Sequence, residues 1–176
     1  MVGNSAKIEY GPCQVTFNAV DLGYFKGGVV LKYDATFLQI EVDQLSMIVD
    51  EKLQKEICVA TVPMVELELS RLTSVAPTGT YVLDGTKKKI TFGGKQVSSS
   101  DFHQLIVTPL TDGALTLDSD SNEKATVHLC MAHIQLSKKY DREGIKVVPV
   151  EFHAIADTTK DAANMLFTLG DTSASV

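Results

Sequence analysis

The chain has 176 residues, of which 44% are apolar, 22% are charged and 7% are aromatic. This length predicts a single domain over residues 1–176, and the composition excludes a disordered protein, a collagen-like repeat and a disulfide-rich scaffold. The net charge of −6 and the isoelectric point of about 5.1 argue against a protein that binds nucleic acid by neutralising phosphates.

Neither a membrane span nor a secretion signal is expected. No run approaches the roughly 18 uninterrupted apolar residues that would span a membrane, and residues 1–7 lack a basic segment followed by an apolar one. Cys13, Cys58 and Cys130 lie far apart, each in an apolar or alternating stretch. An odd number of cysteines without paired spacing predicts reduced, buried thiols in a protein made in a cytosol.

Alternating apolar and polar residues predict the first strands. The alternation runs over residues 29–42, which is typical of a strand with one buried face. The residues expected on that face in its second half are Leu38, Ile40 and Val42. A second strand is predicted at about 56–63, where β-branched residues concentrate.

Between these strands, at about residues 43–55, the alternation stops and we predict a long projecting loop. This segment nevertheless keeps five apolar residues, Leu45, Met47, Ile48, Val49 and Leu53. A solvated loop has little reason to carry them, because together they would form a sticky exposed patch. Two interpretations remain open: the loop covers the core of its own subunit, or it is buried only against a neighbouring copy.

One helix is predicted, from Val65 to Ala76. Apolar residues recur there at helical spacing, and acidic residues at its start suit the positive end of the helix dipole. Pro77 and Gly79 would end it. The same letters also fit a strand over 65–69, because Val, Leu and Leu alternate there.

The remaining sequence is typical of antiparallel strands. The turn dipeptide Asp84–Gly85 predicts a hairpin with arms at 81–83 and 89–92, and a further strand runs over 102–109. After a polar loop at about 111–124, strands are predicted at 127–136, 148–154 and 165–169. The apolar phase flips within 127–136, which predicts a bulge near Ala132 or His133. Eight or nine strands with one helix and no βαβ alternation indicate a mainly β fold, a β-sandwich or β-barrel with one flanking helix.

The sequence offers little catalytic or metal-binding chemistry. His103, His128, His133 and His153 show no metal-ligand spacing, so we expect structural or surface roles for them. Residues 118–122 imitate the start of a calcium loop but lack the required glycine, and residues 93–98 lack the spacing of a phosphate loop. We therefore predict a binding or structural domain without catalytic residues, metal or cofactor.

Several motifs carry more information in combination. Gly27–Gly28 opens a strand that ends in Asp43–Gln44, and the acidic segment Val49-Asp50-Glu51 follows. Residues 59–66, Val-Ala-Thr-Val-Pro-Met-Val-Glu, then run into the predicted helix. A closing strand lies within 146–157, Lys-Val-Val-Pro-Val-Glu-Phe-His-Ala-Ile-Ala-Asp. In this order and spacing the motifs, over about 27–75 and 125–170, resemble the major tail tube proteins of long-tailed bacteriophages.

The resemblance implies subunits that form hexameric rings, which stack into a hollow tube through which phage DNA is delivered. It implies tail terminator, tape measure and baseplate proteins as partners, and a place in the virion tail after synthesis in the bacterial cytoplasm. DNA passes without specific binding, so we expect a net acidic or neutral pore lining. The lysines at 87–89 would then point elsewhere.

The resemblance also assigns the projecting loop to contacts between subunits or between rings, with charged residues setting the register. The expected interface residues are Asp43, Gln44, Leu45, Met47, Ile48, Val49, Asp50, Glu51 and Leu53. The residues that represent the flanking helix are Glu66, Leu69 and Leu72.

Three alternatives stay open at this point. The chain could be the related tube protein of type VI secretion or of a phage-tail-like bacteriocin. It could be another virion component, such as a head decoration or baseplate protein, which would form trimers or one ring instead of an open stack. A small β-barrel enzyme or ligand-binding module would instead show an apolar cavity with converging polar groups.

Overall fold

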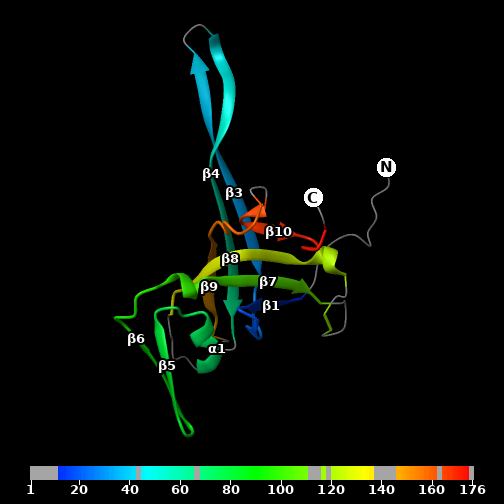
Figure 1. Ribbon diagram of the computed structural model, residues 1–176. Helices are drawn as coiled ribbons and strands as arrows, with labels where there is room; N and C mark the ends of the chain where they lie inside the picture. The colour runs from blue at the N-terminus through cyan, green and yellow to red at the C-terminus, as the bar shows by residue number, and fades with distance from the viewer. Residues whose placement is uncertain are drawn as a thin grey trace.

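The computed structural model describes residues 12–42, 45–65, 68–110, 116–117, 120–136, 146–161 and 164–174. Antiparallel strands dominate this part of the chain, together with one short helix, α1 (Leu69–Ser74) (Figure 1). The strands are β1 (Cys13–Phe17), β2 (Val20–Asp21), β3 (Val30–Val42), β4 (Leu45–Met64), β5 (Gly79–Asp84), β6 (Lys87–Phe92), β7 (His103–Pro109), β8 (Ala125–Ile134), β9 (Val148–Ala154) and β10 (Phe167–Leu169).

Eight of these strands form one sheet, in the order β2-β1-β7-β8-β9-β4-β3, with β10 also paired to β8. Strands β5 and β6 form a separate two-stranded sheet. The predicted mainly β fold of about eight strands with one flanking helix is therefore confirmed. The large sheet is open, with β2 and β3 at its edges, so the architecture is closer to a sandwich than to a barrel.

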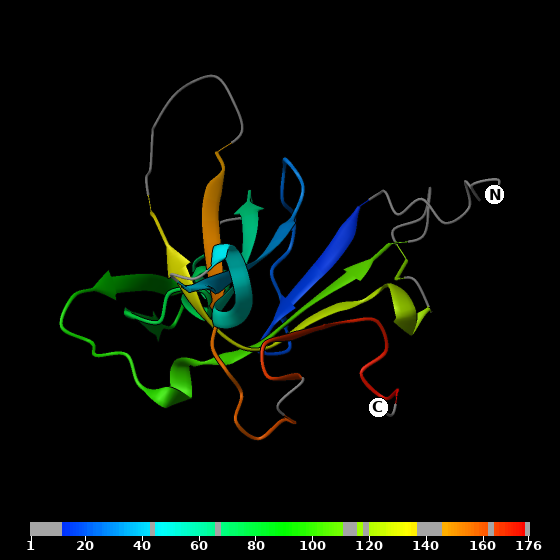
Figure 2. The same ribbon diagram turned by 90° about the horizontal axis from the view of Figure 1, so that it is seen from above.

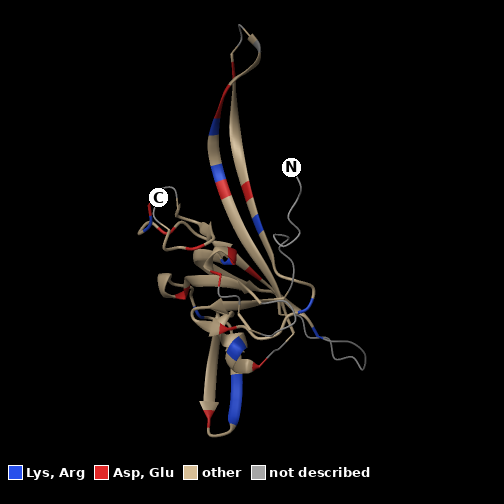
Figure 3. Cartoon of the chain, turned by 90° about the vertical axis from the view of Figure 1, so that its right-hand side faces the viewer, with Lys and Arg blue, Asp and Glu red and all other residues tan. Residues whose placement is uncertain are grey.

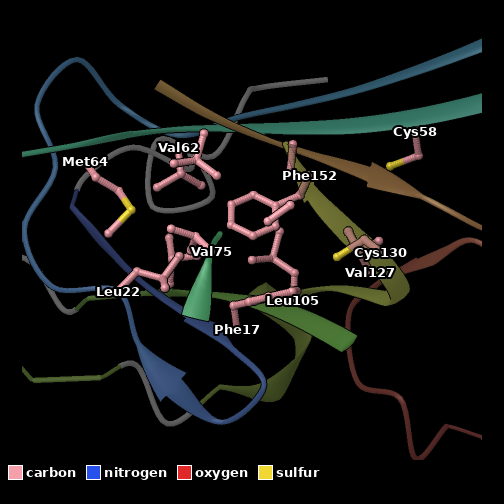
Figure 4. Packing of buried hydrophobic residues seen from close by; sticks show 14 of the residues in the cluster. Phe17, Leu22, Cys58, Val62, Met64, Val75, Leu105, Val127, Cys130 and Phe152 are labelled. Atoms are coloured by element: carbon pink, nitrogen blue, oxygen red, sulfur yellow. The ribbon is translucent and has the colours of Figure 1, made fainter. Parts of the chain in front are cut away.

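The large sheet curls around a single core (Figure 4). Two strands separate β1 from β9, which in a flat sheet would place them about 14 Å apart. The ring centroids of Phe17 on β1 and Phe152 on β9 are nevertheless only 4.9 Å apart. The sheet must therefore bend so that its distant strands face one another. Val15, Leu22, Val62, Met64, Leu105 and Val150 fill the space between them and are fully buried.

Helix α1 closes one side of this core, but it begins later than the sequence predicts. The backbone N–H of Val65 donates to the carbonyl of Tyr24 at 3.0 Å, which ties Val65 to an extended segment. The helix can therefore start only after it, at Leu69. Leu72 is buried, and Leu69 packs against the core. Glu66, which we assigned to the helix, lies outside the described residues.

Two further predictions about strands are wrong. From residue 45 onwards, the predicted loop at 43–55 is the first half of β4. The alternation fails there because β4 is bulged: its register against β3 shifts opposite Thr36/Phe37 and twice more between Ile40 and Val42. In β8 the irregularity lies between Val127 and Cys130, not near Ala132 or His133, which pair with β9 in regular register.

The described residues of the polar loop predicted at 111–124 lie outside the long strands. Leu117 makes an isolated bridge to Leu110, and residues 121–123 form a short 3-10 turn. The predicted hairpin around Asp84–Gly85 is confirmed as β5–β6, where Gly85 takes the positive φ of 57° that the tight turn requires.

The molecule has two projections that point in opposite directions. The β3–β4 hairpin rises from one end of the domain, and the β5–β6 hairpin extends from the other (Figure 1). Figure 2 looks down the long hairpin and shows the strands of the domain spread around its base.

Candidate assembly surface

The long β3–β4 hairpin leaves the domain just beyond the last pair that β4 makes with β9, Val59 with His153. From Asp34 to Val42, β3 pairs only with β4, and β4 pairs only with β3 over the same stretch. Nine extended residues span about 30 Å. Within the described residues, the outer hairpin is thus a two-stranded ribbon that pairs with no third strand.

The base of the hairpin is held firmly. The Tyr33 hydroxyl donates to Oε1 of Glu56 at 2.5 Å, an interaction that raises the pKa of Tyr33. The ring of Tyr33 also packs on Phe167 of β10, with centroids 5.4 Å apart. Cys58, on the opposite strand, is buried. The ribbon therefore starts from a fixed point on the domain.

Beyond this base, large apolar side chains of the ribbon are exposed. Seven of them have exposed fractions between 44% and 65%: Phe37, Leu38, Leu45, Met47, Ile48, Val49 and Leu53. We call these seven residues the apolar ribbon surface. Because side chains alternate along a strand, these residues lie on both faces of the ribbon, with Phe37 and Leu53 on one face and Leu38 on the other. Large exposed apolar areas are uncommon on monomeric proteins and often mark interaction sites. An isolated two-stranded hairpin is also only marginally stable in water.

This arrangement excludes the first of the two interpretations of the segment, that it covers the core of its own subunit, and leaves the second as a prediction. Leu45, Met47, Ile48, Val49 and Leu53 do not cover the core of their own subunit, because all five are exposed on the ribbon. The accompanying carboxylates Asp50 and Glu51 are exposed beside them on β4. The other two expected interface residues, Asp43 and Gln44, lie outside the described residues.

The expected helix residues do not belong to this surface. Leu69 and Leu72 pack at the core, at the other end of the domain from the ribbon. The sequence also assigned Leu38 and Val42 to a buried face, which is wrong: they are 52% and 36% exposed. Their alternation is that of a strand with an apolar face, but this face stays exposed in the part of the chain that the structure describes.

The tip of the ribbon is acidic. Residues 41–51 contain four acidic residues and no basic residue. Glu51 accepts a hydrogen bond from the side-chain amide of Gln39 at 2.9 Å, and Asp50 accepts one from the backbone N–H of Glu51 at 2.9 Å. Figure 3 shows this acidic region near the end of the hairpin, with lysines closer to the domain.

The side chains of His128, His133 and His153 make local contacts in the described structure. Nε2 of His128 lies 2.8 Å from both Oδ1 of Asn164 and Oγ1 of Thr168, which ties the C-terminal strand β10 to β8. His133 and His153 stack with centroids 4.3 Å apart. Partial burial, with the neighbouring His153 adding to it, lowers the pKa of His133. Within the described ranges, no group of three His, Cys, Asp or Glu side chains is placed to hold a metal ion.

A small pocket lies near the N-terminal strand, lined by Pro12, Cys13, Gln14, Asp21, Gly23, Tyr24, Phe25, Arg71 and Leu110. Its carboxylate, Asp21, already accepts hydrogen bonds from the Gln14 side chain at 2.7 Å and from the Gly23 N–H at 2.8 Å. These contacts brace the β1–β2 turn. The pocket is therefore explained by local structure.

Comparisons with known proteins do not add a family to this picture. No model of a known protein family matches the chain, and no curated protein is significantly similar to it in sequence. In the part of the chain that the structure describes, no helix is both long enough and apolar enough to cross a membrane.

Proposed function

We propose that this chain is a structural subunit of a bacteriophage tail, the major tail tube protein, whose copies form hexameric rings that stack into the tube for DNA delivery. The observation that carries the proposal is the apolar ribbon surface, about 30 Å of two-stranded hairpin that the subunit itself does not cover. Burying such a surface against other copies would remove it from water and order it.

The open edges of the hairpin also support self-assembly. β3 is an edge strand of the large sheet, so one side of its 13-residue backbone pairs with no other strand among the described residues. The outer half of β4 has a free edge as well, because β9 reaches only to Val59. Free edges of this length are templates for β-augmentation, which natural monomers usually block.

The proposed role accounts for the charge of the chain. A conduit for DNA must not hold phosphates, and a net charge of −6 repels them. In the proposed tube the pore lining is acidic or neutral and the subunits carry no cofactor. The tail terminator, tape measure and baseplate proteins would cap and fill the tube within the virion.

Shortening the hairpin tests the proposal. Replacing residues 37–54 by Asn-Gly joins Thr36 to Lys55, which are paired in register, through a tight two-residue turn. We expect the full chain to form rings and tubes in negative-stain microscopy and to sediment as large particles. The shortened chain should fold, with unchanged near-UV circular dichroism, and should sediment as a monomer.

A second variant keeps the number of residues in the hairpin but removes the apolar side chains of its outer part, by replacing residues 45–53 with a Gly/Ser linker. This variant should also stay monomeric. Tubes of normal length from either variant, or a full chain that remains monomeric at every concentration, would contradict the proposed function.

A further inference from the structure

The β5–β6 hairpin is the second projection of the domain, and it points away from the β3–β4 ribbon (Figures 1 and 3). It is joined to the body through Ile90, which packs against the core, and through its contacts with α1. From Val82 to Lys89 every residue is exposed. The far half of this hairpin is therefore a free surface in the subunit.

This surface is basic. Residues 79–92 carry three lysines and one aspartate, a net charge of +2 within a chain whose net charge is −6. Lys88 is already used: its Nζ lies 3.2 Å from Oε1 of Glu68, and this contact lowers the pKa of that carboxyl. Side chains alternate along a strand, so Lys87 and Lys89 share the other face. Neither has an ionic partner among the described residues.

The two projections complement one another. Among the described residues of the ribbon tip, Glu41, Asp50 and Glu51 are acidic and none is basic, whereas the end of β5–β6 is basic. Each also exposes an apolar side chain on the same face as these charges: Ile48, which pairs with Glu41, and Val82, which pairs with Lys89. Because they point in opposite directions, copies stacked head to tail bring the tip of one close to the β5–β6 hairpin of the next.

We propose that the β5–β6 hairpin is the docking site for the ribbon tip of a second copy of this chain. Lys87 and Lys89 face Glu41 and Glu51 of the neighbouring copy, and the adjoining apolar side chains are buried between them. The contact is heterologous, so it leaves a free tip and a free docking site at the two ends and can extend without closing. This inference rests on the proposed function, and it identifies the partner surface that stacking uses.

Charge exchange tests this contact. The variant Lys87→Glu/Lys89→Glu places like charges against the tip, and Glu41→Lys/Glu51→Lys does so from the other side. Each should raise the critical concentration for assembly about tenfold or more, because opposed like charges are strongly unfavourable at an interface. The variant with all four substitutions restores opposite charges and should assemble at close to the wild-type concentration.

The matched control is Lys26→Glu/Lys160→Glu, which makes the same change in net charge as Lys87→Glu/Lys89→Glu at two exposed lysines that belong to neither hairpin. It should assemble like the wild type. Near-UV circular dichroism of every variant checks folding, and the fourfold variant shows directly whether a poorly assembling parent is misfolded, because restored assembly requires folded subunits.

The outcomes separate this inference from the proposed function. If the wild type forms tubes but the fourfold variant assembles no better than its two parents, the tip docks elsewhere and only this inference fails. An equal loss of assembly in the control would also overturn it, because general charge and not docking would then be responsible. A wild type that forms no tubes would overturn both.

Discussion

The two halves of β4 differ in how far the subunit buries their apolar side chains. In the C-terminal half, Ala60, Val62 and Met64 are fully buried against the curled sheet. In the N-terminal half, Leu45, Met47 and Leu53 are at least 50% exposed on the two-stranded ribbon. The same strand therefore contributes to the buried core at one end and to an exposed apolar surface at the other. Stability should depend on the first half, and assembly on the second.

Substitution in the core should have the largest effect on folding. Phe152 is fully buried and packs on Phe17 at a centroid distance of 4.9 Å. Truncation by Phe152→Ala leaves a cavity between strands that the curl of the sheet brings together. The free energy of unfolding should fall by about 3–5 kcal/mol, measured by urea denaturation of the subunit. A loss below about 1 kcal/mol would show that the two halves of the core do not depend on this contact.

Substitution in the ribbon should have a large effect on assembly and a small effect on the stability of the subunit. Replacing Leu45, Met47 and Val49 by serine should abolish tubes while changing the free energy of unfolding by no more than about 0.5 kcal/mol per site. The control replaces three exposed apolar residues of the body, Leu136, Val147 and Leu169, by serine. Sedimentation should find monomers for the first variant and tubes for the second. Tubes from both would remove the distinction between the two halves of β4.

The sequence predicts the interior of this fold better than its projections. Period-two patterning places β7 and β9 well because their apolar faces meet a real core. It fails over 45–55, because three bulges break the alternation of β4 and because an exposed apolar ribbon looks like a buried strand or an irregular loop. The composition of residues 45–53 was more informative than their spacing, because five apolar residues in an exposed segment indicate an interaction surface.

The turn between β1 and β2 shows a second reason why prediction from the sequence is incomplete. Val15 and Phe17 are buried core residues of β1, yet the turn that joins β1 to β2 uses Asn18 and Ala19 at φ values of 51° and 60°. Alanine is uncommon in that conformation, and no Asn-Gly or Asp-Gly pair marks the turn. The pairing of β1 with β7 holds this turn in place, although the local sequence does not predict it.

The three cysteines differ in how deeply their thiols are buried, and this difference predicts their reactivity. Burial raises the pKa of all three thiols, and for Cys130 it does so to about 12, with Cys58 adding to the effect. Cys13 is half-buried, whereas Cys58 and Cys130 are buried. A raised pKa leaves less thiolate near pH 8, so alkylation by iodoacetamide should be fastest at Cys13 and slowest at Cys130, as measured by mass spectrometry.

Cys58 and Cys130 should also stay unpaired without a reductant. Strand β9 lies between β4 and β8, so their Cα atoms are separated by about two strand spacings, roughly 10 Å (Figure 4). A disulfide needs Cα atoms within about 7 Å. An intact mass 2 Da below that of the reduced chain would contradict this placement of the strands.

The smallest effect concerns the outer face of the sheet, where His133 stacks on His153. The folded state lowers the pKa of His133 from its ordinary value of about 6.5, so the unfolded chain binds the proton more readily. This contribution to stability is present above pH 6.5 and is lost as the pH falls below it. His133→Asn should reduce the loss of stability between pH 7 and 5.5 by less than about 1 kcal/mol, because the site is exposed. An unchanged pH dependence would show that the stacked pair does not matter.

Hydrogen exchange in the free subunit and in tubes tests the central claim, that the outer ribbon is completed only by other copies. Backbone amides of residues 37–42 and 45–53 should exchange rapidly in the subunit, because a two-stranded ribbon opens locally at little cost. In tubes their exchange should slow by about 100-fold or more, while residues 59–64 of β4 stay protected in both. Equal protection of the ribbon in the subunit and in the tube would contradict the account.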